Sequence, residues 1–398
     1  MTSAEPVHVI GAGLAGLAAA CTLAEAGQAV VLRESAKAAG GRARSFFDTR
    51  LGALIDNGNH LLLSGNGAVM AYLRRIGTLG SLTGPDGPVF PFIDLEHGAR
   101  WTLRINRGRL PWWIFVPAMR VPDTRLRDYL LLLKLQRARP GDLVAGLAGQ
   151  AGPLYRNLLE PLAVAALNTP PELASALPLK AVLAETIARG GDAAIPRFPA
   201  TGLSESFVDP ALAWLRSRGA EIRLNDRVTE IDPARKTILA TPPWVAAELL
   251  PGLIVPEEFQ AILNLHFKCR VDPGEAGFWG LVGGLSEWVF AKGEIFSVTI
   301  SAANRYPEAG NAALAAKVWA ELAAAFGLAR DMPDYRVVRE KRATFAATPA
   351  QLARRPGTRT PYANLMLAGD WTDTGLPATI EGAIRSGNAA ALAILGRK

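Results

Sequence analysis

Cysteine residues and long apolar runs are scarce in this chain, and each scarcity excludes a class of protein. The 398 residues include two cysteines, Cys21 and Cys269. Two cysteines so far apart provide neither a disulfide framework nor a metal-ligand spacing, so we expect no metal and a reducing compartment. No run reaches the roughly 18 uninterrupted apolar residues that a membrane-spanning helix requires. Any membrane contact is therefore expected to be peripheral.

Acidic residues are scarce between residues 100 and 139. That segment holds ten Lys and Arg residues against Asp123 and Asp128, a net charge of +8, whereas the whole chain carries +7. The basic residues form a single block and no nucleic-acid-binding module accompanies them, which argues against nucleic acid as a partner. The basic block therefore needs another explanation.

The same basic segment also carries apolar side chains. An aromatic run extends from Trp112 to Val116, and Leu126, Leu130 and Leu133 recur at helical spacing. Cationic side chains interleaved with tryptophans suit an anionic membrane surface. The alternative is an ordinary amphipathic helix that packs on the core and leaves its basic face in water.

Glycine is abundant, and its first cluster has the spacing of a dinucleotide-binding turn. An apolar strand, Val7 to Ile10, is followed by Gly11, Gly13 and Gly16 and then by a predicted helix from Leu14 to Ala26. In such a turn the first glycine permits the tight bend, the second lets the backbone approach a pyrophosphate, and the third lets the helix pack closely. We predict that Gly11, Gly13, Leu14, Ala15 and Gly16 bind the pyrophosphate of a dinucleotide.

An acidic residue follows at the distance that this motif requires. Glu34 ends the next predicted strand, Ala29 to Leu32, and lies 23 residues after Gly11. A carboxylate at this place accepts hydrogen bonds from the adenosine ribose. Glu34 and its neighbour Ser35 are therefore predicted to bind the cofactor.

Two later glycine segments resemble FAD-binding motifs. Gly40-Gly41-Arg42 and Ala368-Gly369-Asp370 resemble those of the amine oxidase and phytoene desaturase superfamily of flavoproteins, and a helix is predicted to begin near Thr379. That resemblance implies FAD, with Arg42 along its pyrophosphate and ribityl chain and the helix aimed at the flavin, where its dipole stabilises the reduced form. The implied contacts are Gly41, Arg42, Asn57, Gly58, Gly369, Asp370, Ala378, Thr379 and Ile380.

A middle region resembles the module that reads the adenine ring in this superfamily. A helix from Val208 to Gly219 and strands at Ile222 to Leu224 and Val228 to Ile231 are predicted, with Val228 as the residue against adenine. The connection from Asp232 to Thr237 is shorter than is usual in relatives.

The match narrows at three segments. Residues 41–46, 55–63 and 368–381 resemble the hydroxysqualene dehydroxylases, FAD-dependent enzymes of bacterial hopanoid biosynthesis, although that family is expected to carry glutamine where this chain has Asn59. The resemblance implies hydroxysqualene as substrate, hydride transfer from reduced FAD and squalene as product. No separate nicotinamide site is visible, so a separate electron donor or reductase is expected as a partner.

Removal of a hydroxyl group requires help from a general acid. His60 lies in the segment expected beside the flavin and titrates near neutrality, so it is the predicted acid, with Asn59 as a hydrogen-bonding neighbour and Asp56 as an orienting carboxylate. The alternative for His60 is a structural histidine held by a hydrogen bond.

Aromatic side chains gather in a predicted antiparallel sheet from Gly277 to Ser301. Trp279, Trp288, Phe290 and Phe296 lie in this stretch, which resembles the floor of the superfamily's substrate domain. Aromatic faces can stabilise a cation, but strand aromatics usually form core, and we interpret these four residues as core.

Together these patterns predict an α/β protein with a Rossmann-like FAD-binding domain and an interleaved α+β substrate domain. Residues 1–95, 190–250 and 346–398 are assigned to the first, and residues 96–189 and 251–345 to the second. We expect a cytoplasmic protein that binds the inner face of the cell membrane peripherally.

Motifs alone do not give the direction of hydride transfer. An oxidative desaturase of a carotenoid precursor such as phytoene uses the same fold, and a flavin-bearing lipid carrier without turnover is a further alternative. Turnover with a polyprene substrate would separate these alternatives.

Overall fold

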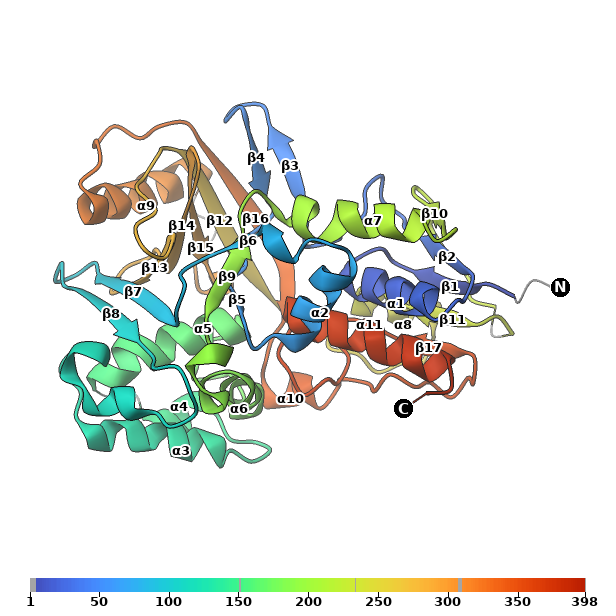
Figure 1. Ribbon diagram of the computed structural model, residues 1–398, viewed down its shortest axis with the longest axis horizontal. Coiled ribbons are helices and arrows are strands. Elements are labelled where there is room, and N and C mark those ends of the chain that lie inside the picture. The colour runs from blue at the N-terminus through green and yellow to red at the C-terminus, as the bar shows by residue number, and fades with distance from the viewer. Residues whose placement is uncertain (1–4, 150–151, 233, 307–309, 398) are drawn as a thin grey trace.

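The computed structural model describes residues 5–149, 152–232, 234–306 and 310–397. Figure 1 shows two sheets side by side, a parallel sheet near the two termini and a larger one at the far end of the molecule. Among the described residues, no helix combines the length and hydrophobicity needed to cross a bilayer.

The first sheet is parallel and Rossmann-like. Its strand order is β10-β2-β1-β11-β17, with every neighbouring pair parallel. Its strands are β1 (Val7–Ile10), β2 (Val30–Arg33), β10 (Glu221–Arg223), β11 (Thr237–Leu239) and β17 (Leu365–Leu367).

Helices α1 (Leu14–Glu25) and α11 (Ile380–Ile394) pack closely beside this sheet (Figure 1). A Cβ on Gly387 of α11 would lie 2.0 Å from the carbonyl oxygen of Ala15 in α1, so only glycine permits this approach. The two ends of the chain are thereby joined in one apolar core. The described residues also form four shorter helices outside the larger sheet. They are α2 (Gly67–Arg75), α7 (Asp209–Arg216), α8 (Pro243–Leu249) and α10 (Pro349–Leu352).

The second sheet has seven strands in the order β16-β12-β15-β14-β13-β7-β8, and β13 and β7 form its one parallel pair among the described strands. Its strands are β7 (Val89–Asp94), β8 (Arg100–Arg104), β12 (Phe259–Lys268), β13 (Phe278–Val282), β14 (Trp288–Lys292), β15 (Ile295–Ile300) and β16 (Tyr335–Phe345).

Helices cover both faces of the second sheet (Figure 1). Helix α9 (Asn311–Phe326) packs on one face through an apolar cluster with β12 and β15. A second apolar cluster joins the other face, on the side of β7, β8, β13 and β14, to a helical layer. The layer comprises α3 (Leu130–Gln136), α4 (Val144–Ala148), α5 (Glu160–Leu167) and α6 (Ala176–Glu185).

Two small sheets lie between the large ones. One is the hairpin β3 (Ser45–Asp48) and β4 (Ala53–Asp56). The other combines three short strands: β5 (Leu62–Leu63), β6 (Leu82–Thr83) and β9 (Pro196–Pro199). These short strands connect the Rossmann-like sheet with the seven-stranded sheet.

The α/β fold class is confirmed, and so is the antiparallel pairing within residues 277–301. The strand predicted at Val228 to Ile231 is wrong, because the described backbone there is irregular. Both side chains pack against an apolar cluster around β11 and β17 without joining a ladder. Apolar side chains at positions 228 and 231 predict burial, but they do not supply a strand partner.

Candidate functional site

The glycine turn after β1 is shaped by close backbone contacts. Gly11 has φ +102°, and a Cβ there would lie 2.5 Å from the carbonyl oxygen of Ala240, while a Cβ on Gly16 would lie 1.8 Å from that of Gly11. A Cβ on Gly13 would meet no atom of the described residues within 4 Å. The turn therefore has two positions closed by the protein itself and one that is open to a ligand.

Leu14 and Ala15 begin α1 directly after this open position, and the helix N-terminus has neither a side-chain cap nor an acidic residue in its first turn. Its first backbone N–H groups lack intrahelical partners and carry partial positive charge. These features fit the pyrophosphate of FAD.

The second glycine segment lies against the first. Gly40 N donates to the carbonyl of Ala12 at 2.8 Å, and Gly13 and Gly40 form an isolated parallel bridge. Gly41 follows with φ +57°, and a Cβ there would come within 3.4 Å of Gly13 Cα. Residues 27 positions apart in sequence thus frame the same open position.

Glu34 lies at the end of β2 and contacts the turn. Its Oε2 accepts from Ala12 N at 2.8 Å, and its Oε1 accepts from Ala36 N at 2.9 Å and from Ser35 Oγ at 3.3 Å. The carboxylate therefore fixes the glycine turn. A ribose contact by Glu34 and Ser35 stays a prediction.

The C-terminal segment reaches the same edge of the sheet through an ion pair. Arg42 Nη2 lies 2.7 Å from Asp370 Oδ1, and Gly369, at φ +151°, donates its N–H to Ser386 Oγ at 2.8 Å. Ser386 belongs to α11, so the ion-pair segment and the helix are held together. All three glycine segments meet here.

Helix α11 begins at Ile380 and is capped by Thr379, whose Oγ1 accepts from Gly382 N at 3.1 Å. Ala378 packs with the apolar cluster around β11 and β17. The helix start is thus held in place beside Asp370, which suits the predicted role of its dipole at the flavin.

A pocket connects this region with the second sheet. Arg342 lies over the ring of Trp244, with its Cζ 4.5 Å from the ring centroid. The pocket thus combines two guanidinium groups with aromatic walls, a set that suits an anionic, ring-bearing cofactor. It is lined by Arg42, Pro242, Pro243, Trp244, Phe259, Arg342, Phe345, Asp370 and Trp371.

Val228 is partly buried and packs against the same apolar cluster as Ala378. No hydrogen bond of the described residues distinguishes it, and its contact with adenine stays a prediction.

The segment after β4 is hydrogen-bonded to the second sheet. Asn264 of β12 donates from Nδ2 to the carbonyl of Asn57 at 3.1 Å, and its Oδ1 accepts from Asn59 N at 3.4 Å. A Cβ on Gly58 would lie 3.0 Å from Asn264 Nδ2. Asn59 Nδ2 donates to Thr299 Oγ1 on β15 at 3.2 Å. The predicted flavin-side segment is therefore positioned by β12 and β15.

Asp56 is buried and has three partners. Its Oδ1 accepts from Ser45 Oγ at 2.7 Å and from Leu203 N at 2.8 Å, and its Oδ2 lies 2.9 Å from Lys292 Nζ. Burial alone would raise the pKa of Asp56, but Lys292 and these hydrogen bonds outweigh it, so the pKa is lowered. Asp56 makes no hydrogen bond to the His60 ring among the described residues, and its orienting role stays a prediction.

His60 is partly buried, and its ring makes no hydrogen bond with another described residue. Burial lowers its pKa to about 4, with Asp56 opposing and Lys292 and Arg42 adding to the shift. The imidazole is therefore neutral near pH 7. A neutral imidazole can donate a hydrogen bond, but its role as general acid requires the bound substrate or cofactor to raise its pKa.

Four site residues were missed by the sequence reasoning: Asn264, His266, Lys292 and Thr299. His266 is buried, its Nδ1 lies 2.7 Å from Ser297 Oγ, and burial lowers its pKa to about 4. One signal could have found the two β12 residues. Asn264 and His266 interrupt the apolar positions 263, 265 and 267 at every second residue, which marks one polar strand face.

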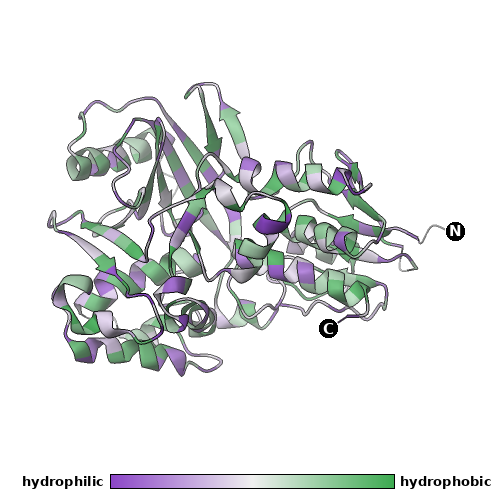
Figure 2. Cartoon of the chain, in the orientation of Figure 1, coloured by the Kyte–Doolittle hydropathy of each residue, from purple (hydrophilic) through white to green (hydrophobic). Residues whose placement is uncertain are grey.

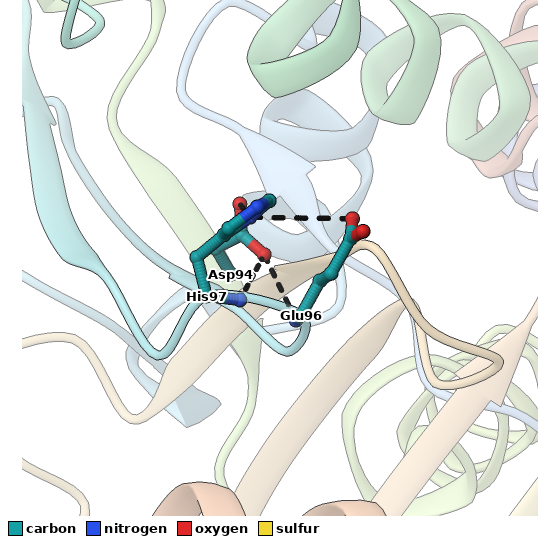
Figure 3. Close-up of side chains that lie close together, drawn as sticks. All are labelled: Asp94, Glu96 and His97. Atoms are coloured by element: carbon teal, nitrogen blue, oxygen red, sulfur yellow. Dashed lines mark hydrogen bonds and ion pairs between the residues drawn. The ribbon is translucent and has the colours of Figure 1, made fainter.

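Figure 3 shows a separate cluster of Asp94, Glu96 and His97, whose ligand-type atoms lie within 4.8 Å of one another. Asp94 Oδ1 accepts from the backbone N–H groups of Glu96 and His97, and Arg156 Nη1 lies 2.6 Å from Asp94 Oδ2. These contacts stabilise the β7–β8 turn, and an arginine balances its acidic charge.

The basic segment of residues 100–139 places apolar side chains in solvent. Trp113 is buried, whereas Trp112 is 51% exposed and Leu110 81% exposed. Figure 2 shows hydrophobic and hydrophilic residues interleaved along α3 at the outer edge of the helical layer. The exposed apolar patch consists of Leu110, Trp112, Phe115, Val116, Leu126, Leu130 and Leu133.

Comparison with known proteins places these features in a family. The family model described as flavin containing amine oxidoreductase matches residues 14–268 and 291–395. Hydroxysqualene dehydroxylase of Rhodopseudomonas palustris is 47% identical over 98% of this chain and 98% of its own length. The protein of that name from Zymomonas mobilis is 42% identical over 96% of this chain and 97% of its own.

Solved structures share the fold at low sequence identity. Cyclohexylamine oxidase from Brevibacterium oxydans has a TM-score of 0.72 at 18% identity, over 98% of this chain and 99% of that one. A putrescine oxidase variant has a TM-score of 0.70 at 16% identity, over 99% of each chain.

Membership of a flavin-containing family implies FAD as the cofactor, and the open position at Gly13 and the uncapped start of α1 fit that molecule. The chain belongs to the flavin-containing amine oxidoreductases and, within them, to the hydroxysqualene dehydroxylases.

Proposed function

We propose that this protein converts hydroxysqualene to squalene. The observation that carries the proposal is its 42–47% identity, over nearly the full length, to three hydroxysqualene dehydroxylases. In the reaction a C–O bond breaks, the hydroxyl takes up a proton and leaves as water, and a C–H bond forms. Bound reduced FAD supplies the two electrons as hydride.

The residues of this chain bind the cofactor and position the reacting groups. The backbone around Gly13 and the start of α1 hold the pyrophosphate, while Arg42 and Asp370 hold the adjoining part of the cofactor. Asn57 and Gly58 are fixed against β12 beside the reacting end. His60 and Asn59 would contact the leaving hydroxyl, and Asp56 is paired with Lys292. A separate donor or reductase supplies the reducing equivalents.

Anaerobic turnover tests this function. Purified protein with chemically reduced FAD is incubated with hydroxysqualene in detergent, and products are identified by gas chromatography with mass detection. We expect squalene, together with reoxidation of the flavin. Unchanged hydroxysqualene beside reduced flavin would contradict the proposal, and formation of a more unsaturated product from phytoene by the oxidised enzyme would favour a desaturase.

A variant separates the role of His60 from cofactor binding. His60→Ala should slow squalene formation and leave bound FAD unchanged, because the ring makes no hydrogen bond that holds the described structure together. Equal turnover of variant and wild type would contradict a catalytic role for this histidine.

We further propose that the exposed apolar patch binds an anionic membrane surface, where a thirty-carbon polyprene resides. Its apolar side chains lie among basic residues, and aromatic rings with flanking cations suit the headgroup region. Arg104 is bound to Glu275 through two contacts of 3.0 and 2.7 Å, so its charge is already balanced within the protein. Arg109 and Lys134 are exposed and form no ion pair with another described residue, so they are better candidates for lipid contact.

Sedimentation with liposomes tests this surface. Leu130→Ser combined with Leu133→Ser should weaken binding to vesicles containing phosphatidylglycerol, and Arg109→Glu with Lys134→Glu should weaken it in a salt-dependent way. Arg104→Glu is the matched control, because its partner lies within the protein. Equal sedimentation of all variants would favour a solvated basic face.

A further inference from the structure

One face of the seven-stranded sheet carries a pattern that the proposed reaction explains. On β12, Leu263, Leu265 and Phe267 point toward the α9 side, so Asn264 and His266 occupy the opposite face. On β15 the same alternation puts Phe296, Val298 and Ile300 toward α9 and leaves Ser297 and Thr299 on the opposite face. This opposite face is polar at β12 and β15.

On the neighbouring strand, β14, the same face of the sheet carries aromatic side chains. Trp288 and Phe290 of β14 pack in the other apolar cluster, with Phe198 and Phe278. The strand register aligns Asn264 with Thr299 and Thr299 with Trp288, and it aligns His266 with Ser297 and Ser297 with Phe290. Each row therefore changes from polar to aromatic over two strand steps, roughly 10 Å.

The sequence-based interpretation of four core aromatics is thereby refined. Trp279 and Phe296 do pack on the α9 side. Trp288 and Phe290 belong to the other face, beside the polar residues that contact Asn59.

The polar part of this face is buried and organised around the flavin-side segment. Asn264 is 1% exposed and Thr299 is 8% exposed, so their hydrogen bonds stabilise groups that would otherwise be costly to bury. The backbone N–H of Asn59 can only donate and the carbonyl of Asn57 can only accept, which fixes the Asn264 amide with Oδ1 toward Asn59 and Nδ2 toward Asn57.

The orientation of the Asn59 side chain follows from that of Asn264. Thr299 Oγ1 donates its one proton to Asn264 Oδ1 at 2.8 Å, so it accepts from Asn59 Nδ2 at 3.2 Å. The side-chain Oδ1 of Asn59 accepts no hydrogen bond from another described residue. Asn59 thus presents a fixed carbonyl oxygen and a second N–H, which match the donor and the acceptor of an alcohol.

We propose that the Asn59 amide binds the hydroxyl of the substrate and that Thr299 and Asn264 are the positioning residues that orient it. Trp288 and Phe290 pack against Phe198 and Phe278 in the apolar cluster, so they form a buried wall beside these polar residues. This inference rests on the proposed function, because it names how that reaction recognises its alcohol.

Substitution of Thr299 tests the positioning role. Thr299→Val keeps the side-chain shape but removes the acceptor that fixes Asn59, so kcat/KM for hydroxysqualene should fall tenfold or more. Thr299→Ser keeps the hydroxyl and should restore most of the activity. The matched control is Thr344→Val on β16, a threonine of the same 8% exposure that accepts from Asn168 at 2.9 Å in the same sheet.

Binding to the oxidised enzyme gives a readout without turnover. Perturbation of the flavin spectrum on titration with hydroxysqualene and with squalene measures how strongly the hydroxyl is recognised. Wild type and Thr344→Val should prefer the alcohol, whereas Thr299→Val and Asn59→Ala should bind both compounds alike. FAD content should be the same in all four proteins.

The outcomes separate this inference from the proposed function. Wild-type enzyme that forms no squalene would contradict the proposed function itself. Wild-type turnover with an unchanged preference for the alcohol in Thr299→Val and Asn59→Ala would overturn the inference alone. If Thr299→Val fails to fold, Asn59→Ala decides, because Asn59 lies in a loop and is only partly buried.

Discussion

The two large sheets place functional residues by different means. At the edge of the parallel sheet the backbone itself forms the site, and glycine is required where a Cβ would strike a carbonyl oxygen, as at Gly11 and Gly16. On the seven-stranded sheet the site is formed by side chains that meet only through register, as Asn264 and Thr299 do. A site formed by the backbone can therefore be recognised from a short sequence motif. The residues of a site that forms through strand pairing are spread along the chain.

Substitutions in the glycine turn should have the largest effect and therefore test this contrast first. Gly16→Ala would force a Cβ against the Gly11 carbonyl, and we expect no stable fold or a loss of more than about 4 kcal/mol in the free energy of unfolding. Gly13→Ala meets no described atom and has an ordinary φ of −71°, so it should fold normally but bind FAD at least tenfold more weakly.

Thermal denaturation of the apoprotein and fluorescence titration with FAD measure these two effects separately. Normal FAD binding by Gly13→Ala would show that the pyrophosphate does not approach this turn.

The buried ion pair between the sheets should give the next largest effect. Lys292→Met leaves the Asp56 carboxylate buried without its cation, and the expected loss is about 3–5 kcal/mol in the free energy of unfolding. Adding Asp56→Asn should recover much of it, since no charge then remains unpaired. Lys268→Met, at an exposed strand end, is the control. Urea denaturation of these four proteins and of Asp56→Asn alone checks the prediction, and additive losses would contradict a direct coupling.

Acid should destabilise the folded protein through two of its histidines, His60 and His266. Burial lowers the pKa of both His60 and His266 from 6.5 to about 4, so the unfolded chain binds more protons than the folded one between those values. Their contribution is complete above pH 6.5 and is lost as the pH falls toward 4, by at most about 3 kcal/mol for each histidine.

Denaturation curves of His266→Asn from pH 7 to pH 4 test this dependence. The variant should lose less stability than wild type on acidification, because it lacks the buried imidazole whose pKa is lowered. An identical pH dependence in the two proteins would contradict a buried neutral His266.

The helix cap at the cofactor end should give the smallest effect on stability. Thr379→Ala removes the Oγ1 that caps α11 and should cost about 1 kcal/mol. Thr348→Ala removes a similar cap from α10, at 3.3 Å from Gln351 N. Both should lower the melting temperature slightly, but only Thr379→Ala should weaken FAD binding. Equal FAD affinity in the two variants would show that the α11 cap does not contribute to cofactor binding.

Much of the cofactor end could be predicted from sequence because its constraints are local. The strand, glycine turn and helix around residues 7–25 follow from apolar runs and from the conformations that only glycine adopts. The strand expected at Val228 to Ile231 was wrong because the apolar side chains at its two ends indicate burial and not the presence of a pairing partner. Asp56 was selected from the sequence as an orienting carboxylate, but its cation could not be predicted, since Lys292 lies 236 residues later.

The sequence by itself determined the FAD-type fold, the glycine turn and the basic apolar segment, because each depends on neighbours along the chain. Only the tertiary structure decided which side chains meet: Lys292 with Asp56, Asn264 with Asn57, and Thr299 with Asn59. It also decided that His60 is neutral near pH 7, because burial removes water from the ring. Burial and strand register arise from the whole fold, and no local pattern specifies them.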